Sequence, residues 1–206
     1  SIQNKLARKG ILETIYNGAP DLLLGEKSKK LTYEKGRNLK IITVSRLDEP
    51  KDPFTLLKAL NRIKTLNWQL TIIGNGSLIG AIRDFITQQG LTDKIILIDE
   101  NYEIERYLQN SDLFILSTKS EGFPRSIIEA MRSSLPVIAS NVAGNYEAVR
   151  SGINGDLFEP GDDLRLATLV KQLIENPNLV ANYGKEGRIL YEKSFRFEIM
   201  ANKTKD

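Results

Sequence analysis

The 206-residue sequence contains no cysteine and no histidine. These two absences exclude disulfide bonds, zinc sites built on cysteine or histidine, cysteine nucleophiles and the Ser-His-Asp arrangement within this chain. Any catalysis by these residues must therefore use carboxylates, arginine, lysine, hydroxyl groups and backbone dipoles.

Other common features are missing as well. No apolar run approaches the roughly 20 residues that a membrane-spanning helix requires, and the absence of a G-x-x-x-x-G-K-[ST] motif excludes a P-loop NTPase. The formal net charge is only +3, and its lysines and arginines are scattered. A small phosphorylated ligand therefore suffices to explain the charge, and nucleic acid is not needed. We expect a cytoplasmic protein that is at most peripheral at the inner face of the membrane.

From Lys40 onward, short apolar runs alternate with longer amphipathic segments. This alternation is typical of βαβ units and a parallel sheet. The sequence therefore predicts an α/β fold, a Rossmann-like parallel sheet flanked by helices. The expected strands are Lys40–Val44, Gln69–Ile73, Lys94–Ile98, Leu113–Leu116, Pro136–Ala139 and Gly155–Phe158.

Local signals predict where helices begin and end. Asp52 followed by Pro53 is typical of an N-cap and a first helical position, and Gly90 is typical of the residue that follows a helix. Further helices are expected to begin at Ser77, at Pro124 and at Asp162 or Asp163, the last of them ending before Pro177.

The chain is expected to have three parts. Residues 1–37 are interpreted as an interdomain linker and helix tail, 38–178 as the Rossmann-like domain, and 179–206 as a C-terminal helical tail. We expect a lone domain to leave the aromatic residues of this tail partly exposed, namely Tyr183, Tyr191, Phe195 and Phe197.

The segment Lys119–Met131 has the strongest chemical signal, because it follows the strand Leu113–Leu116 and ligands bind at the carboxyl ends of strands in open α/β sheets. A helix beginning at Pro124 leaves free N–H groups that form an anion site. Glu121 and Glu129 would accept hydrogen bonds from a polyol there. The alternative is that both are ordinary helix carboxylates, favoured by the helix dipole or by solvent.

Glu121 and Glu129, within EGFPRSIIEAM, resemble the E-x7-E motif of the retaining GT-B glycosyltransferases of family 4, or group 1. The similarity extends along most of the chain. The sequence departs from the family pattern at Ser45, Asp52, Ser134 and Ala143, where glycine is frequent. These departures leave the loop geometry and the identity of the donor open. The other landmarks are Tyr16-Asn17-Gly18 (the crossing between domains), Val44–Lys51, Gly74-Asn75-Gly76, Gly152–Gly155 and Glu159–Asp162.

The resemblance implies residue roles. Arg46 and Lys51 would bind the diphosphate of a nucleotide-sugar donor, Glu121 a hydroxyl of the sugar and Glu129 the ribose. The positions agree with this, because both cations follow the first strand and can stabilise charge on a departing diphosphate. From the residues alone, Arg46 and Lys51 can equally be surface cations.

Further donor contacts are implied around the same loop. Gly122 and Phe123 would bring backbone N–H groups close to the donor, since glycine permits close approach. Pro124 and Arg125 would supply the helix start, and the turn containing Asn101 would lie near the nucleobase.

The implied activity is transfer of a sugar to an acceptor hydroxyl with retention, of the hexosyltransferase type, in polysaccharide biosynthesis. Cations in the site make a metal or cofactor unnecessary. The acceptor, a saccharide or lipid-linked saccharide, would bind through an N-terminal domain that these residues lack, so we expect donor binding without efficient transfer by this chain alone.

Two other enzyme classes remain alternatives. Gly74-Asn75-Gly76 follows a strand and opens a helix, with Asp99 about 20 residues further on, which resembles the fingerprint of a NAD(P)-dependent dehydrogenase. A GT-B-type nucleotide-sugar epimerase or phosphorylase would share the sheet and the anion sites.

Overall fold

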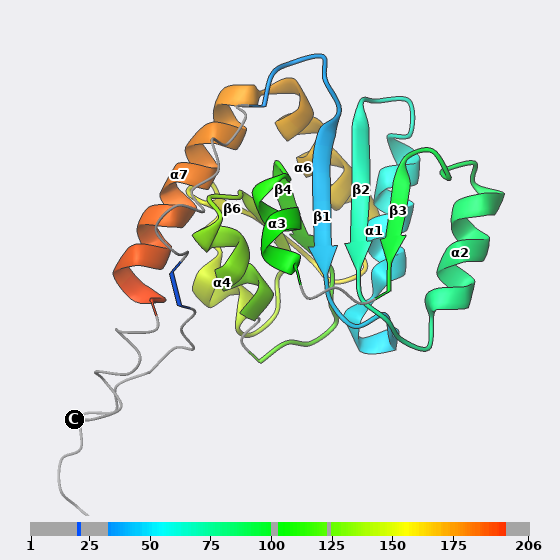
Figure 1. Ribbon diagram of the computed structural model, residues 1–206, viewed down its shortest axis with the longest axis horizontal. Helices are drawn as coiled ribbons and strands as arrows, with labels where there is room; N and C mark the ends of the chain where they lie inside the picture. The colour runs from blue at the N-terminus through cyan, green and yellow to red at the C-terminus, as the bar shows by residue number, and fades with distance from the viewer. Residues whose placement is uncertain (1–19, 22–32, 100–102, 123–124, 197–206) are drawn as a thin grey trace, which may run out of the picture.

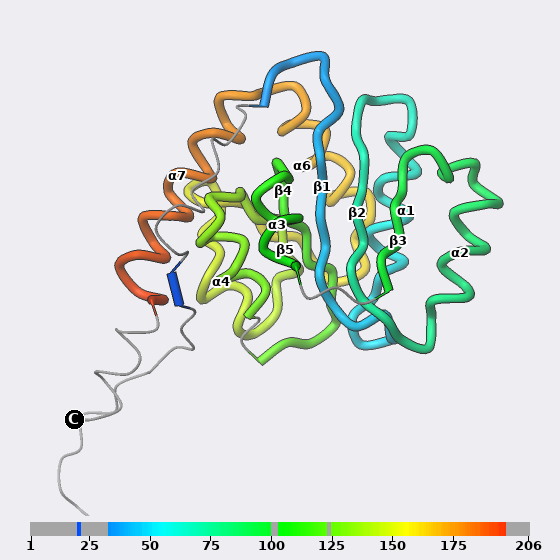
Figure 2. The backbone as a smooth tube through the Cα atoms, viewed as in Figure 1, coloured from blue at the N-terminus to red at the C-terminus, as the bar shows by residue number. Residues whose placement is uncertain are grey.

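The computed structural model describes residues 20–21, 33–99, 103–122 and 125–196. Its sheet has six parallel strands in the order β3-β2-β1-β4-β5-β6, and the backbone trace shows β1 between β2 and β4 (Figure 2). The α/β, Rossmann-like prediction is confirmed. The strands are β1 (Leu39–Val44), β2 (Trp68–Ile73), β3 (Ile95–Ile98), β4 (Leu113–Leu116), β5 (Val137–Ser140) and β6 (Gly155–Phe158).

Helices cover both faces of the sheet, with α3 and α4 in front of it and α1 and α6 behind it in Figure 1. They are α1 (Pro53–Arg62), α2 (Ile79–Gln88), α3 (Ile104–Gln109), α4 (Arg125–Arg132), α5 (Asn145–Ala148), α6 (Asp163–Glu175) and α7 (Pro177–Ser194), with the 3-10 turn η2 (Glu49–Lys51) before α1.

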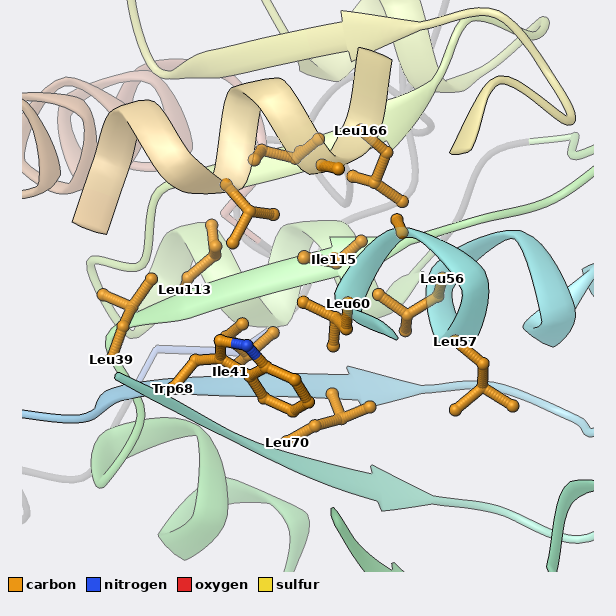
Figure 3. Close-up of a cluster of buried hydrophobic side chains, with 14 of the residues drawn as sticks. Leu39, Ile41, Leu56, Leu57, Leu60, Trp68, Leu70, Leu113, Ile115 and Leu166 are labelled. Atoms are coloured by element: carbon orange, nitrogen blue, oxygen red, sulfur yellow. The ribbon is translucent and has the colours of Figure 1, made fainter. Parts of the chain in front are cut away.

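Two buried clusters lie on opposite faces of the sheet. The first packs α1 and α6 against alternate residues of the central strands, with Trp68 fully buried at its centre (Figure 3). The second includes Phe114 and joins α4 to α7. Because side chains alternate along a strand, both faces must be apolar for helices to cover them. β4 and β5 are accordingly buried at every position.

Most helix boundaries follow the sequence signals. Asp162 caps α6 by accepting a hydrogen bond from the N–H of Arg165 at 2.8 Å, and Gly90 follows α2 in the left-handed region at φ +67°. The start expected at Ser77 is wrong by two residues, since α2 begins at Ile79. Asp52 precedes α1 as predicted, but its carboxylate binds the Thr55 hydroxyl at 2.6 Å instead of a backbone N–H.

The aromatic residues of α7 do not remain exposed as expected. Tyr183, Tyr191 and Phe195 are all buried, and Phe197 lies outside the described residues. α7 covers the second cluster beside α4. Burial beside Asp156, whose carboxylate accepts a hydrogen bond from Tyr183 at 3.1 Å, raises the pKa of Tyr183 to about 12.

Segments that precede β1 are fixed to the domain by hydrogen bonds. The Tyr33 hydroxyl donates to the carbonyl oxygen of Ile174 at 3.0 Å. The Arg188 guanidinium, on α7, binds both carboxylate oxygens of Asp21 at 2.9 and 2.8 Å. Asp21 and Tyr33 are therefore anchored to the last two helices.

Asp112 holds the amino ends of β1 and β4 together. Its carboxylate accepts two hydrogen bonds from Arg37, at 2.8 and 2.7 Å, and one from the N–H of Lys40 at 2.9 Å. The residue is only 3% exposed. The pairing of β1 with β4 is thus reinforced at the edge of the sheet opposite the carboxyl ends.

We expect Asp112→Asn to lower the free energy of unfolding by about 1.5 to 3 kcal/mol, because it weakens hydrogen bonds to a charged group. Urea unfolding at pH 7 measures the change. The control is Glu175→Gln, which breaks the exposed pair with Lys171 on α6 and should cost less than about 0.5 kcal/mol. Equal effects of the two changes would contradict a special role for Asp112.

Candidate functional site

The candidate site lies at the carboxyl ends of β1 and β4. These strands are neighbours in the sheet, but the chain leaves β1 toward β2 on one side and β4 toward β5 on the other. Such a switch point opens a crevice at the carboxyl edge, where doubly wound sheets bind their ligands. The loops that follow β1 and β4 both end there.

Hydrogen bonds fasten these two loops to each other. The carbonyl oxygen of Pro50, in η2, accepts a hydrogen bond from the N–H of Lys119 at 2.9 Å and lies 2.9 Å from the hydroxyl of Thr118. The N–H of Thr118 donates to the Ser140 hydroxyl at the end of β5, at 2.9 Å. Thr118 is fully buried. The loop after β4 is therefore positioned from both sides.

This fastening brings Lys51 and Glu121 together, 70 residues apart in the sequence. Lys51 Nζ lies 2.5 Å from Glu121 Oε2, and the two side chains are 23% and 17% exposed. The second oxygen of Glu121 accepts a hydrogen bond from the N–H of Gly122 at 3.2 Å. Two of the three residues predicted as catalytic thus form one half-buried ion pair at the switch point.

Arg46, the third, does not join this pair. Its guanidinium lies 2.6 Å from Asp48 and its side chain is 80% exposed. No ion pair among the described residues connects it to Lys51 or Glu121. Arg46 belongs to the same loop as Lys51, so it stands at the rim of the site as a solvated cation.

Glu129 lies inside α4, where Arg125 Nε is 3.2 Å from its Oε1. Burial raises the pKa of Glu129 above its ordinary value of 4.5, and the Arg125 guanidinium partly opposes this shift. Gly122 has open space around it, since a Cβ there would meet no atom within 4 Å. Phe123, Pro124 and Asn101 lie outside the described residues.

The glycines after β2 serve the packing of the fold. A Cβ on Gly74 would lie 1.9 Å from the carbonyl oxygen of Ser45, and one on Gly76 would lie 2.2 Å from that of Leu47. The N–H of Leu78 also donates to this Leu47 oxygen, at 2.9 Å. The loop after β2 therefore presses against the loop after β1, whereas a dinucleotide fingerprint presents its glycines to a ligand after the first strand.

Thr118, Ser140 and Asp48 contribute to the site without having been predicted. Their signal is weak in the sequence because serine, threonine and aspartate are common after strands. Only the packing of the loops shows what they bind.

The described residues contain no group of three or more acidic side chains placed to hold a metal ion. None of the described helices combines the length and apolarity needed to cross a membrane.

The sheet order and the switch point define a doubly wound, Rossmann-like domain. Residues 26–189 match the family model "Glycosyl transferases group 1", and the chain belongs to this family. The dehydrogenase alternative is not favoured by this result.

Several relatives have names of the same class. The chain is 28% identical to an uncharacterized glycosyltransferase of Methanocaldococcus jannaschii, over 89% of this chain and 49% of that protein. It is 30% identical to the capsular polysaccharide biosynthesis glycosyltransferase CapM of Staphylococcus aureus, over 86% and 47%. The chain thus spans about half the length of these relatives.

Solved structures show the same fold. Sucrose-phosphate synthase of Thermosynechococcus elongatus superposes with a TM-score of 0.80 at 23% identity, over 93% of this chain and 50% of that one. HepE of Anabaena, in complex with UDP and glucose, gives a TM-score of 0.78 at 23% identity, over 82% and 47%.

We expect Glu129→Gln to stabilise the chain increasingly as the pH rises from 4 to 7. In the wild type, the raised pKa means that protonated Glu129 favours the folded state below pH 4.5, and this contribution is lost as the pH rises through the folded pKa. The neutral amide of the Glu129→Gln variant does not ionise, so its burial does not become more costly as the pH rises. Urea unfolding at several pH values tests this, with Glu175→Gln as the matched control, and a gain that is independent of pH would contradict it.

Proposed function

We propose that this domain binds the nucleoside diphosphate of a sugar donor at the carboxyl edge between β1 and β4. The observation that carries the proposal is the half-buried pair of Lys51 and Glu121 at the switch point. A cation and a carboxylate side by side match the two chemical parts of such a donor, a phosphate and a sugar hydroxyl. Arg46 at the rim would add a second cation.

In the proposed reaction, the full-length protein transfers a hexose from the donor to an acceptor hydroxyl with retention. Lys51, Arg46 and the start of α4 would stabilise the negative charge that grows on the leaving diphosphate. Glu121 would orient the sugar through a hydroxyl, and Glu129 would accept hydrogen bonds from the ribose. Gly122 and Arg125 are proposed as further donor contacts, together with Phe123, Pro124 and Asn101.

The names of relatives support this chemistry. One relative, in Escherichia coli, is a UDP-Gal:alpha-D-GlcNAc-diphosphoundecaprenol alpha-1,3-galactosyltransferase, 30% identical over 70% of this chain. The pneumococcal O-GlcNAc transferase GtfA, which has the same fold, was solved with UDP and GlcNAc. We therefore propose a saccharide or lipid-linked saccharide as the acceptor, bound by residues outside this chain. The proposed location of the protein is the cytoplasm, at the inner face of the membrane. We propose that this chain alone transfers sugar inefficiently.

A thermal-shift panel of UDP, GDP, ADP and NAD(H) tests the donor site. One nucleoside diphosphate should raise the melting temperature as strongly in EDTA as in magnesium, because ligand binding stabilises the folded state and the proposed site uses protein cations in place of a metal. Stabilisation by NAD(H) alone would overturn the proposal. Stabilisation that requires magnesium would overturn the proposal that the donor binds without a metal.

Removing either cation should weaken binding of the stabilising nucleoside diphosphate. We expect Arg46→Ala and Lys51→Ala to cost about 1 to 3 kcal/mol each, the range for a lost hydrogen bond to a charged group. Isothermal titration calorimetry measures the affinities. Lys171→Ala, which removes an exposed, ion-paired cation from α6, should leave them unchanged. If both substitutions in the site behaved like this control, Arg46 and Lys51 would be surface cations.

A further inference from the structure

Lys51 and Glu121 each have the other as a partner of opposite charge. The ammonium lies 2.5 Å from one carboxylate oxygen, and the other oxygen accepts a hydrogen bond from the N–H of Gly122. Both side chains are largely withdrawn from water. An arriving anion therefore meets a cation that already has a negative partner.

The backbone around this pair holds it closed. The Pro50 carbonyl oxygen, next to Lys51 in the chain, binds the N–H of Lys119 and the hydroxyl of Thr118. These bonds join η2, which carries Lys51, to the loop after β4, which carries Glu121. A movement of one of these two segments by itself therefore does not separate the two side chains. A ligand that takes up one of the two charges therefore leaves the other without its partner.

Arg46 differs from Lys51 in this respect. Its exposed guanidinium binds Asp48 with one nitrogen and, with five N–H donors in all, can bind a phosphate without leaving Asp48. The Lys51 ammonium has three donors but lies half-buried against Glu121, so a phosphate that approaches it also approaches a carboxylate. Competition is therefore strongest at Lys51, where the cation as well as the carboxylate is withdrawn from water.

We propose that Glu121 competes with a phosphate for Lys51, and that this competition makes the site select ligands that carry both a phosphate and a sugar hydroxyl. This inference rests on the proposed donor-binding function. A phosphate alone binds Lys51 but leaves the half-buried Glu121 carboxylate unpaired beside another anion, which is unfavourable. A sugar diphosphate also supplies a hydroxyl that donates to Glu121.

The same competition favours release of the product. After sugar transfer, the nucleoside diphosphate no longer carries the hydroxyl that occupied Glu121. The carboxylate then returns to Lys51 and weakens the hold of the ammonium on the phosphate. Glu121 would thus make the site bind the intact sugar donor more tightly than the product nucleoside diphosphate. It would do so without contacting that product.

Inorganic pyrophosphate, which has neither base nor sugar, isolates this effect. Calorimetric titration of the 206-residue chain should show that Glu121→Gln binds pyrophosphate roughly two- to fivefold more tightly than the wild type, the scale of a partly exposed ion pair. In a Lys51→Met background, Glu121→Gln should bring no such gain, because no ammonium is left for the carboxylate to compete for. Melting curves confirm that each variant is folded.

Glu49→Gln is the matched control. Glu49 pairs with Lys119 at 3.3 Å between the same two loops, but its side chain is 74% exposed. The substitution removes the same charge from the same region and should change pyrophosphate affinity by less than about 1.5-fold. An equal gain from Glu49→Gln would show a general charge effect and overturn the inference.

Other outcomes separate this inference from the proposed function. If a nucleoside diphosphate stabilises the wild type and Glu121→Gln shows no gain for pyrophosphate, the competition is wrong and the donor site stands. If Glu121→Gln gains affinity for pyrophosphate and no nucleotide stabilises the wild type, the competition stands and the donor function fails. Absence of pyrophosphate binding in both forms overturns the competition.

Discussion

The adjacency of β1 and β4 is the constraint on which the candidate site depends. These strands are separated in the sequence by β2 and β3, so only their pairing in the sheet brings the loops after them into contact. Asp112 reinforces the pairing at the amino end, and Pro50 joins the loops at the carboxyl end. The distance between Lys51 and Glu121 is therefore a property of the whole sheet.

Two positions at which the resemblance leads us to expect glycine have a backbone conformation that favours glycine. Asp52 and Ser134 are the non-glycine residues with positive φ in the described part of the chain, at +41° and +57°. They are also two of the four positions where the sequence departs from the glycines frequent in the family. Aspartate tolerates this region better than most residues, and its carboxylate binds Thr55 one turn later. Asp52 and Ser134 therefore adopt positive φ angles, a backbone conformation that glycine adopts readily.

The sequence predicted the fold well where one strong local signal decided the structure. Leu113–Leu116 has the predicted bounds because a short apolar run, buried on both faces, can only be a central strand in this pattern. The start of α2 was misplaced because the backbone at Gly76 is held against Leu47, and such a contact leaves no local pattern. η2 and α5 span three and four residues, too few for a helical period to be visible.

The sequence suggested the residues of the candidate site individually, but it could not suggest how they pair. Resemblance to the family named Lys51, Glu121, Arg46 and Glu129 as separate contacts of a ligand. In the structure each of them already has a partner of opposite charge: Lys51 binds Glu121, Arg46 binds Asp48, and Glu129 binds Arg125. A ligand that binds here exchanges charged partners within the protein, and the cost of each exchange grows as the pair is withdrawn from water. The Arg46 pair is the most exposed of the three and would be the least costly for a ligand to share. The half-buried Lys51 pair would be the most costly, so in the proposed site it would have the largest effect on which ligands bind.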